Sequence, residues 1–108
     1  MARVQARSQQ LLGRILAAQE QHKQADDYFE QAIELFSRNE MRLDYARTLY
    51  GYGVTLLQRS TPVEETYQRG LYYLQQARDL FRECGAAVDL QWAERILAHL
   101  ELQNAGVQ

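Results

Sequence analysis

Hydrophobic and polar residues follow the period of an α-helix along almost the whole chain. In five segments the apolar residues recur three and four positions apart, with polar residues between them. β-branched residues are few, and helix-favouring Ala, Leu, Gln, Glu and Arg dominate. The pattern predicts an all-α fold with helices over about residues 3–20, 23–38, 41–59, 62–83 and 87–103, followed by a frayed tail at 104–108.

The first segment gathers its large apolar residues on one stripe, a pattern typical of a helix face that packs on a neighbour. The stripe consists of Val4, Leu11, Leu12, Ile15 and Leu16. Gly13 lies among them, and a glycine inside a helix costs about 1 kcal/mol relative to alanine. We therefore expect the next helix to approach closely at Gly13, and at Gly53, which has the same place in the third segment.

The clearest boundary signals lie around the fourth segment. Thr61 is a good N-cap, Pro62 suits the first helical position, and Glu64 follows Thr61 by three residues, which together predict a capping box. Gly85 is placed to end this helix in a left-handed conformation.

Part of the pattern occurs twice. The run from Tyr28 to Phe36 returns 45 residues later as the run from Tyr73 to Phe81, with Tyr, Gln, Ala, Leu and Phe in matching places. Further along, Asp44 matches Asp89 in the same way. A fixed period over helix-length stretches indicates that one supersecondary unit is repeated and stacked.

The residues of the repeat resemble those of a tetratricopeptide repeat (TPR). That family carries a Leu-Gly pair in its first helix, and a small residue, an aromatic and an alanine in its second. Leu12 with Gly13 matches the first feature, and Ala25, Phe29 and Ala32 match the second at the right spacing. The resemblance implies an α-solenoid of antiparallel helix hairpins that acts by binding proteins.

The second and third units depart from the family pattern. The second reads Tyr52-Gly53 and then Gly70, Leu74 and Ala77, and the third has only Leu97-Ala98 at the Leu-Gly position. The period exceeds the usual 34 residues or so, as in the divergent TPR arrays of large bacterial signalling and transcription regulators. We expect one domain over 1–108, with repeats at about 6–39 and 46–84 and a C-terminal capping helix at about 87–103.

Composition removes several classes of function. The net charge is −2 and Lys23 is the only lysine, so nucleic-acid binding by the arginines is kept only as a weak alternative function. Cys84 is the only cysteine, which excludes an intramolecular disulfide. No apolar run is long enough to span a membrane, and no signal peptide is recognisable at the N-terminus. We expect a soluble, cytoplasmic protein without a membrane partner.

Candidate chemistry is sparse. His22 and His99 have no further Cys or His at the spacing of metal ligands, so no metal site is predicted. The paired acids Asp26-Asp27 and Glu64-Glu65 point about 100° apart on a helix and do not converge for acid–base work. We expect neither an enzyme nor a cofactor.

The TPR resemblance also implies a concave groove lined by the first helix of each hairpin. Carried over position by position, its lining is Arg7, Gln10, Arg14, Arg47, Tyr50, Val54, Trp92, Arg95 and His99. Arginine and aromatic residues are enriched at binding hot spots, and arginines bind carboxylates. The resemblance thus predicts a protein or peptide partner, and the arginines favour an acidic one. Alternatively, the arginines pair with nearby acids of the chain.

A second surface competes with the groove. The fifth segment carries Trp92, Leu100 and Leu102 in addition to its inward residues, so it is apolar on more than one side. Exposed apolar patches often mark association. A self-associating scaffold, forming a homo-oligomer through these three residues, is therefore the alternative function.

Overall fold

The computed structural model describes residues 1–59 and 63–106, which form five α-helices and, within these residues, no strand. This confirms the predicted all-α fold. The helices are α1 (Ala2–Ala18), α2 (His22–Arg38), α3 (Arg42–Leu57), α4 (Glu64–Cys84) and α5 (Ala87–Gly106).

The helix ends lie close to the predicted ones, except at the start of α4 and at the C-terminus. α5 continues to Gly106, so the segment expected to fray from residue 104 is helical over its first three positions. Gly85 ends α4 with φ 70°, as predicted. α4 begins at Glu64, with Val63 at the N-cap and no side-chain capping hydrogen bond, so the predicted capping box does not begin this helix. Thr61 and Pro62 themselves lie outside the described residues, as does the tail at 107–108.

Three of the helices close with the same backbone hydrogen bond. The N–H groups of Gln21, Met41 and Ala86 donate to carbonyls five residues earlier, on Leu16, Phe36 and Phe81, at 2.9, 3.0 and 2.9 Å. The residue before each donor has positive φ: Glu20, Glu40 and Gly85. This bond satisfies carbonyls that a helix end would leave unpaired and turns the chain sharply toward the next helix.

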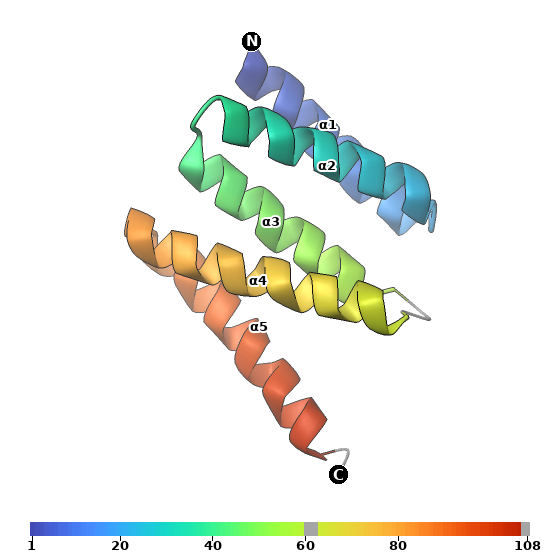
Figure 1. Ribbon diagram of the computed structural model, residues 1–108, viewed down its shortest axis with the longest axis vertical. Helices are drawn as coiled ribbons and strands as arrows, with labels where there is room; N and C mark the ends of the chain where they lie inside the picture. Colours follow the sequence, from blue (N-terminus) through green and yellow to red (C-terminus); the bar gives the residue numbers. More distant parts are fainter. Residues whose placement is uncertain (60–62, 107–108) are drawn as a thin grey trace.

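Each helix packs on the next one along the chain, and α1 also contacts α3. Neighbouring helices run antiparallel, α1 lies behind α2, and α5 lies behind α4 (Figure 1). The result is a flat, elongated molecule of 49 × 34 × 18 Å with its termini at opposite ends. This succession agrees with stacked hairpins, while the assignment as an α-solenoid stays a prediction.

The core forms where the hairpins meet. Phe29 of α2 stacks on Tyr52 of α3 with ring centroids 4.8 Å apart, and Tyr52 stacks on Tyr73 of α4 at 5.2 Å. Arg69 Nη2 donates to the Tyr52 hydroxyl at 2.9 Å. Burial raises the pKa of this hydroxyl, which keeps it neutral.

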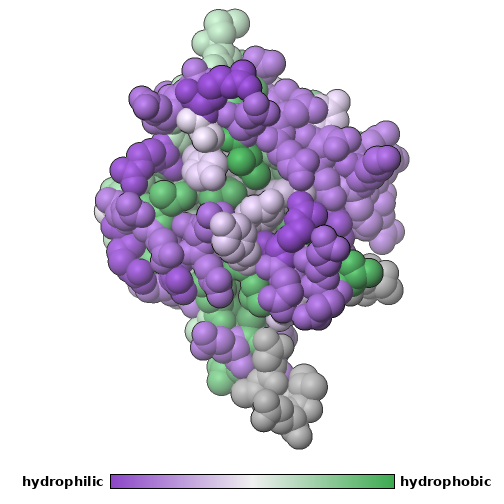
Figure 2. Space-filling model, in the orientation of Figure 1, coloured by the Kyte–Doolittle hydropathy of each residue, from purple (hydrophilic) through white to green (hydrophobic). Residues whose placement is uncertain are grey.

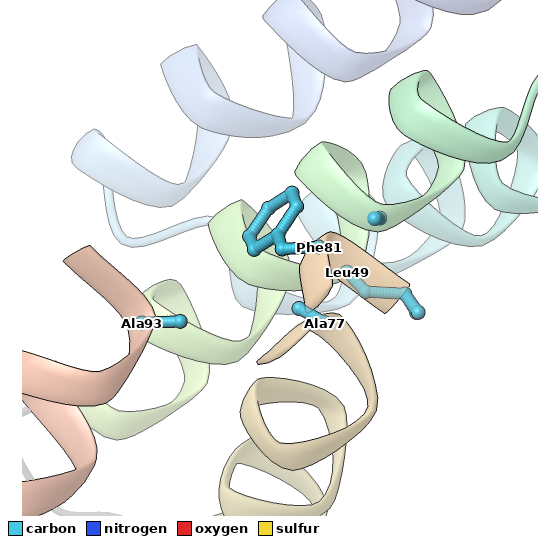
Figure 3. Packing of buried hydrophobic residues seen from close by; sticks show 5 residues of the cluster. Leu49, Ala77, Phe81 and Ala93 are labelled. Carbon is cyan, nitrogen blue, oxygen red and sulfur yellow. The ribbon is translucent and has the colours of Figure 1, made fainter. Parts of the chain in front are cut away.

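A second cluster joins the last three helices. Leu49 of α3, Ala77 and Phe81 of α4, and Ala93 of α5 are all buried and lie together (Figure 3). The small residues let the helices approach, and the large ones fill the remaining space, as close packing requires.

Glycines mark the closest approaches between helices, as the sequence predicted. A Cβ added to Gly13 would lie 3.0 Å from the ring of Phe29 on α2. A Cβ added to Gly53 would lie 2.9 Å from the carbonyl oxygen of Gly70 on α4.

The apolar stripe of α1 is largely exposed, and only Leu16 among its members is half-buried. α1 buries Ala6 and Gly13 instead, and the exposed members of the stripe are Val4 (65%), Leu11 (54%), Leu12 (41%) and Ile15 (45%). The periodicity identified the apolar residues of α1, but the neighbouring helices cover most of them only in part. Leu11 borders a hollow beside α3, and Leu12 and Leu16 border a hollow beside α2. Within a 108-residue molecule, this is a large share of the exposed apolar side chains.

Candidate partner-binding face

The structure brings together four of the nine predicted groove residues around a hollow between α1 and α3. Its volume is about 280 Å³. The lining consists of Arg7, Gln10, Leu11, Arg14, Asp44 and Arg47. Three guanidinium groups and one carboxylate therefore border this hollow.

Asp44 of α3 is the acid that the predicted groove lacked. Its side chain is only 16% exposed, and it accepts a hydrogen bond from Arg7 Nη2 at 3.4 Å. Arg3 Nε lies 3.6 Å from its other oxygen. Both arginines belong to α1 and are well exposed, so these ion pairs tie α1 to α3 with a modest free energy, about 0–1 kcal/mol each.

Arg47 makes the corresponding contact one repeat later. Its Nε and Nη2 donate to the two oxygens of Asp89 on α5 at 3.2 and 3.0 Å, a bidentate pair. The hydrogen bond that Arg47 donates to Asp89 raises the pKa of Arg47, so this guanidinium stays charged.

These two contacts form a repeating ladder of ion pairs. Arg7 and Arg47 hold equivalent places in α1 and α3, and each reaches the aspartate of the next odd-numbered helix, Asp44 or Asp89. Two of the four predicted groove arginines therefore hold acids of the chain itself, the alternative left open by the sequence. The ladder also shows that α1, α3 and α5 line one face of the molecule, here called the partner face.

Arg14 is placed differently from Arg7 and Arg47. Among the described residues it makes no ion pair. It also lines a second hollow of about 300 Å³, together with His22 of α2 and Arg59 after α3. In the described structure, His22 Nδ1 and Arg59 Nε are buried without a hydrogen-bond partner. Arg14 thus stands between two polar hollows.

On α5, Trp92 and Arg95 contact each other. The Arg95 guanidinium lies 5.2 Å from the centre of the Trp92 ring, within the range of a cation–π contact. Trp92 is 53% exposed. His99, the last predicted groove residue, is also exposed. The α1–α3 hollow is lined by residues of α1 and α3 alone, so these three α5 side chains do not contribute to it.

Tyr50 and Val54 are half-buried rather than open to a partner. The Tyr50 ring is tilted against Phe81 of α4, with centroids 6.3 Å apart. Burial raises the pKa of the Tyr50 hydroxyl. Tyr50 therefore contributes to the core beneath the partner face more than to its surface.

The three residues predicted for self-association do not share one side of α5. Trp92 and Leu102 are exposed, at 53% and 73%, whereas Leu100 is half-buried. A helix advances about 100° per residue, so Leu100 and Leu102 point to nearly opposite sides.

Sequence reasoning missed the two aspartates and Leu11. The signal for the aspartates was present, because Asp44 and Asp89 are themselves related by the 45-residue repeat. Over residues 1–59 and 63–106, no group of three His, Cys, Asp or Glu residues is arranged to hold a metal ion. In the same residues no helix is both long and apolar enough to cross a membrane.

Family models, curated proteins and solved structures were compared with this chain, and none of them matches it. The TPR resemblance rests on the residues that carry it.

Proposed function

We propose that this chain is a TPR-like α-solenoid that serves as a protein–protein interaction module. It binds an acidic peptide or protein segment on the partner face and carries out no chemical step. The observation that carries the proposal is the hollow between α1 and α3, where Arg14 stands without an ion pair of its own beside Leu11. The exposed thiol of Cys84 fits a reducing compartment, and we place the module in the cytoplasm.

The arginines of the face divide into two groups with different roles. Arg7 and Arg47 keep α1, α3 and α5 together through Asp44 and Asp89. Arg14 is the cation that remains to receive a carboxylate of the partner, because a guanidinium without an acid of its own loses no existing pair on binding. Arg95, stacked on Trp92, offers a second contact further along the face.

The surroundings of these cations define the chemistry of the partner. Leu11 (54% exposed) borders the α1–α3 hollow and Trp92 (53% exposed) lies on α5, so apolar side chains accompany both cations. A segment that alternates carboxylates with apolar residues satisfies both kinds of contact. Its affinity falls as salt is added, because exposed charge pairs are screened.

The test uses a short fluorescein-labelled peptide of glutamate and leucine as probe, with binding followed by fluorescence anisotropy. Arg14→Glu is expected to weaken binding at least tenfold, through loss of an attraction and gain of a repulsion. The matched control is Arg38→Glu on α2, where the arginine pairs with Glu34 outside the partner face. Equal binding by both variants, or none by the unaltered protein, contradicts the proposal.

Self-association through α5 is the second candidate function. It is favoured by the exposure of Trp92 and Leu102. If it is correct, Trp92→Ala combined with Leu102→Ser lowers the mass in solution, measured by light scattering after size exclusion. An oligomer that keeps its mass with both changes excludes this candidate.

A further inference from the structure

The exposed face of α1 has the spacing of a coiled-coil seam. Its positions follow one another at intervals of three, four, three, four and three residues, as Met1, Val4, Ser8, Leu11, Ile15 and Ala18. All six are exposed. They are called the α1 stripe below, which differs from the apolar stripe of the sequence analysis because it leaves out Leu12 and Leu16. Alternating three and four is the a and d pattern of helices that wind around each other.

The α1 stripe is free along its length. The residues by which α1 packs on the rest of the molecule, Ala6 and Gly13, lie about 200° around the helix from Val4 and Leu11. α2 and α3 therefore leave the stripe accessible to another helix.

The opposite end of the molecule is closed by polar residues. In α3, the face that packs on α4 includes Ala46, Leu49 and Leu56, all buried. Forty-five positions later in α5 the equivalents are Gln91, Glu94 and Glu101, all exposed. A polar outer face is what ends a repeat stack. The face of α5 that a further hairpin would cover is therefore polar, which disfavours head-to-tail stacking of copies.

We infer that α1 pairs with α1 of a second copy of this chain, in a parallel two-stranded arrangement about a twofold axis. The stripe is self-complementary, as a twofold interface requires. In heptad terms Ile15 takes an a position and Leu11 a d position, the combination that favours two strands. Ser8, a polar residue at an a position, pairs with itself across the axis and fixes the alignment of the helices.

The charges beside the stripe select the parallel orientation. Arg7 and Arg14 line one edge, and Gln5, Leu12 and Gln19 line the other. A parallel pair places the arginine edge against the neutral edge of its partner. An antiparallel pair places the arginine edge against itself, with Arg7 facing Arg14 of the second copy, and like charges in contact are unfavourable.

The first test is the mass of the whole chain by light scattering after size exclusion. The expected value is twice the 12.6 kDa of one chain. Leu11→Glu combined with Ile15→Glu is expected to halve it while the far-ultraviolet circular dichroism is retained, because both side chains are exposed in the monomer. The matched control, Trp92→Glu with Leu102→Glu, adds the same charge at exposed apolar sites on α5 and keeps the dimer.

A monomer at every concentration overturns the inference and leaves the stripe to a different protein. A dimer abolished by the α5 pair of changes and not by the α1 pair also overturns it. The acidic-peptide proposal is judged separately, by anisotropy with Arg14→Glu, so the failure of either proposal can be told from the failure of the other.

The second test reports the orientation. In a Cys84→Ser background, Val4→Cys and Ile15→Cys are each oxidised separately. A parallel pair brings each new thiol next to its own copy, so both variants form a disulfide-linked dimer on a denaturing gel. An antiparallel pair puts Val4 opposite Ile15, so neither single variant cross-links and the parallel arrangement is refuted.

Discussion

The two hairpins are repeats of one unit, yet their helices meet in different ways. In the first, Gly13 of α1 faces the ring of Phe29 on α2, and an added Cβ would lie 3.0 Å from that ring. In the second, Gly53 of α3 faces the backbone of Gly70 on α4, and an added Cβ would lie 2.9 Å from its carbonyl oxygen. One contact is between backbone and side chain, and the other is between two backbones.

The difference follows from two coupled changes in sequence. Where the first hairpin has Ala25 and Phe29, the second has Gly70 and Leu74. The smaller leucine leaves space that the phenylalanine fills, and the glycine lets the helices move together until their backbones touch. The two departures of the second hairpin from the repeat pattern, Gly70 and Leu74, therefore compensate for each other in packing.

The largest expected effect comes from Gly53→Ala. The new methyl group meets a carbonyl oxygen and the Leu74 backbone nitrogen, which cannot turn aside as a side chain can. The strain outweighs the gain in helix propensity, and we expect a net loss of about 2 kcal/mol. Urea unfolding at fixed protein concentration measures it. A gain in stability would show that the backbones do not touch.

Gly51→Ala is the matched control on the same helix, with an effect of opposite sign. Apart from the two adjacent residues and the backbone of α3 itself, no atom of the described residues lies within 4 Å of its added Cβ. The substitution therefore keeps the propensity gain, which stabilises the protein by up to about 1 kcal/mol. The same urea experiment checks it, and a loss comparable to that of Gly53→Ala would contradict the comparison.

Gly13→Ala is expected to have the smallest effect. Its methyl group presses on the Phe29 ring, and a shift of a few tenths of an ångström relieves the contact. The strain and the propensity gain nearly cancel, so the net change is within about 0.5 kcal/mol of zero. In the Phe29→Leu background the methyl group has more room, and Gly13→Ala should become clearly stabilising. If it is equally neutral in both backgrounds, the ring is not the neighbour that matters.

The helices and their order were predictable because they depend on local pattern. The apolar period, the small residues at close approaches and Gly85 at the end of α4 are all readable without neighbours. The exposure of the apolar side of α1 was not predictable in this way. Periodicity shows that Val4, Leu11 and Ile15 share one side, but not whether anything covers it.

The partner face was predictable only in part, for a similar reason. Arg7 and Arg47 lie beside the α1–α3 hollow, but their charges are satisfied by Asp44 and Asp89, which are distant in sequence. Pairing across helices depends on how they stack. In the sequence, only the recurrence of the aspartates 45 residues apart indicated this pairing.

The order in which the helices contact one another has a kinetic consequence. Each helix packs mainly on the one that follows it. The further contact, between α1 and α3, joins helices separated by only one helix along the chain. The chain therefore has a low contact order, and folding needs only the closure of short loops. During synthesis each helix finds its partner as soon as the next one emerges, so the chain can fold progressively from its N-terminus.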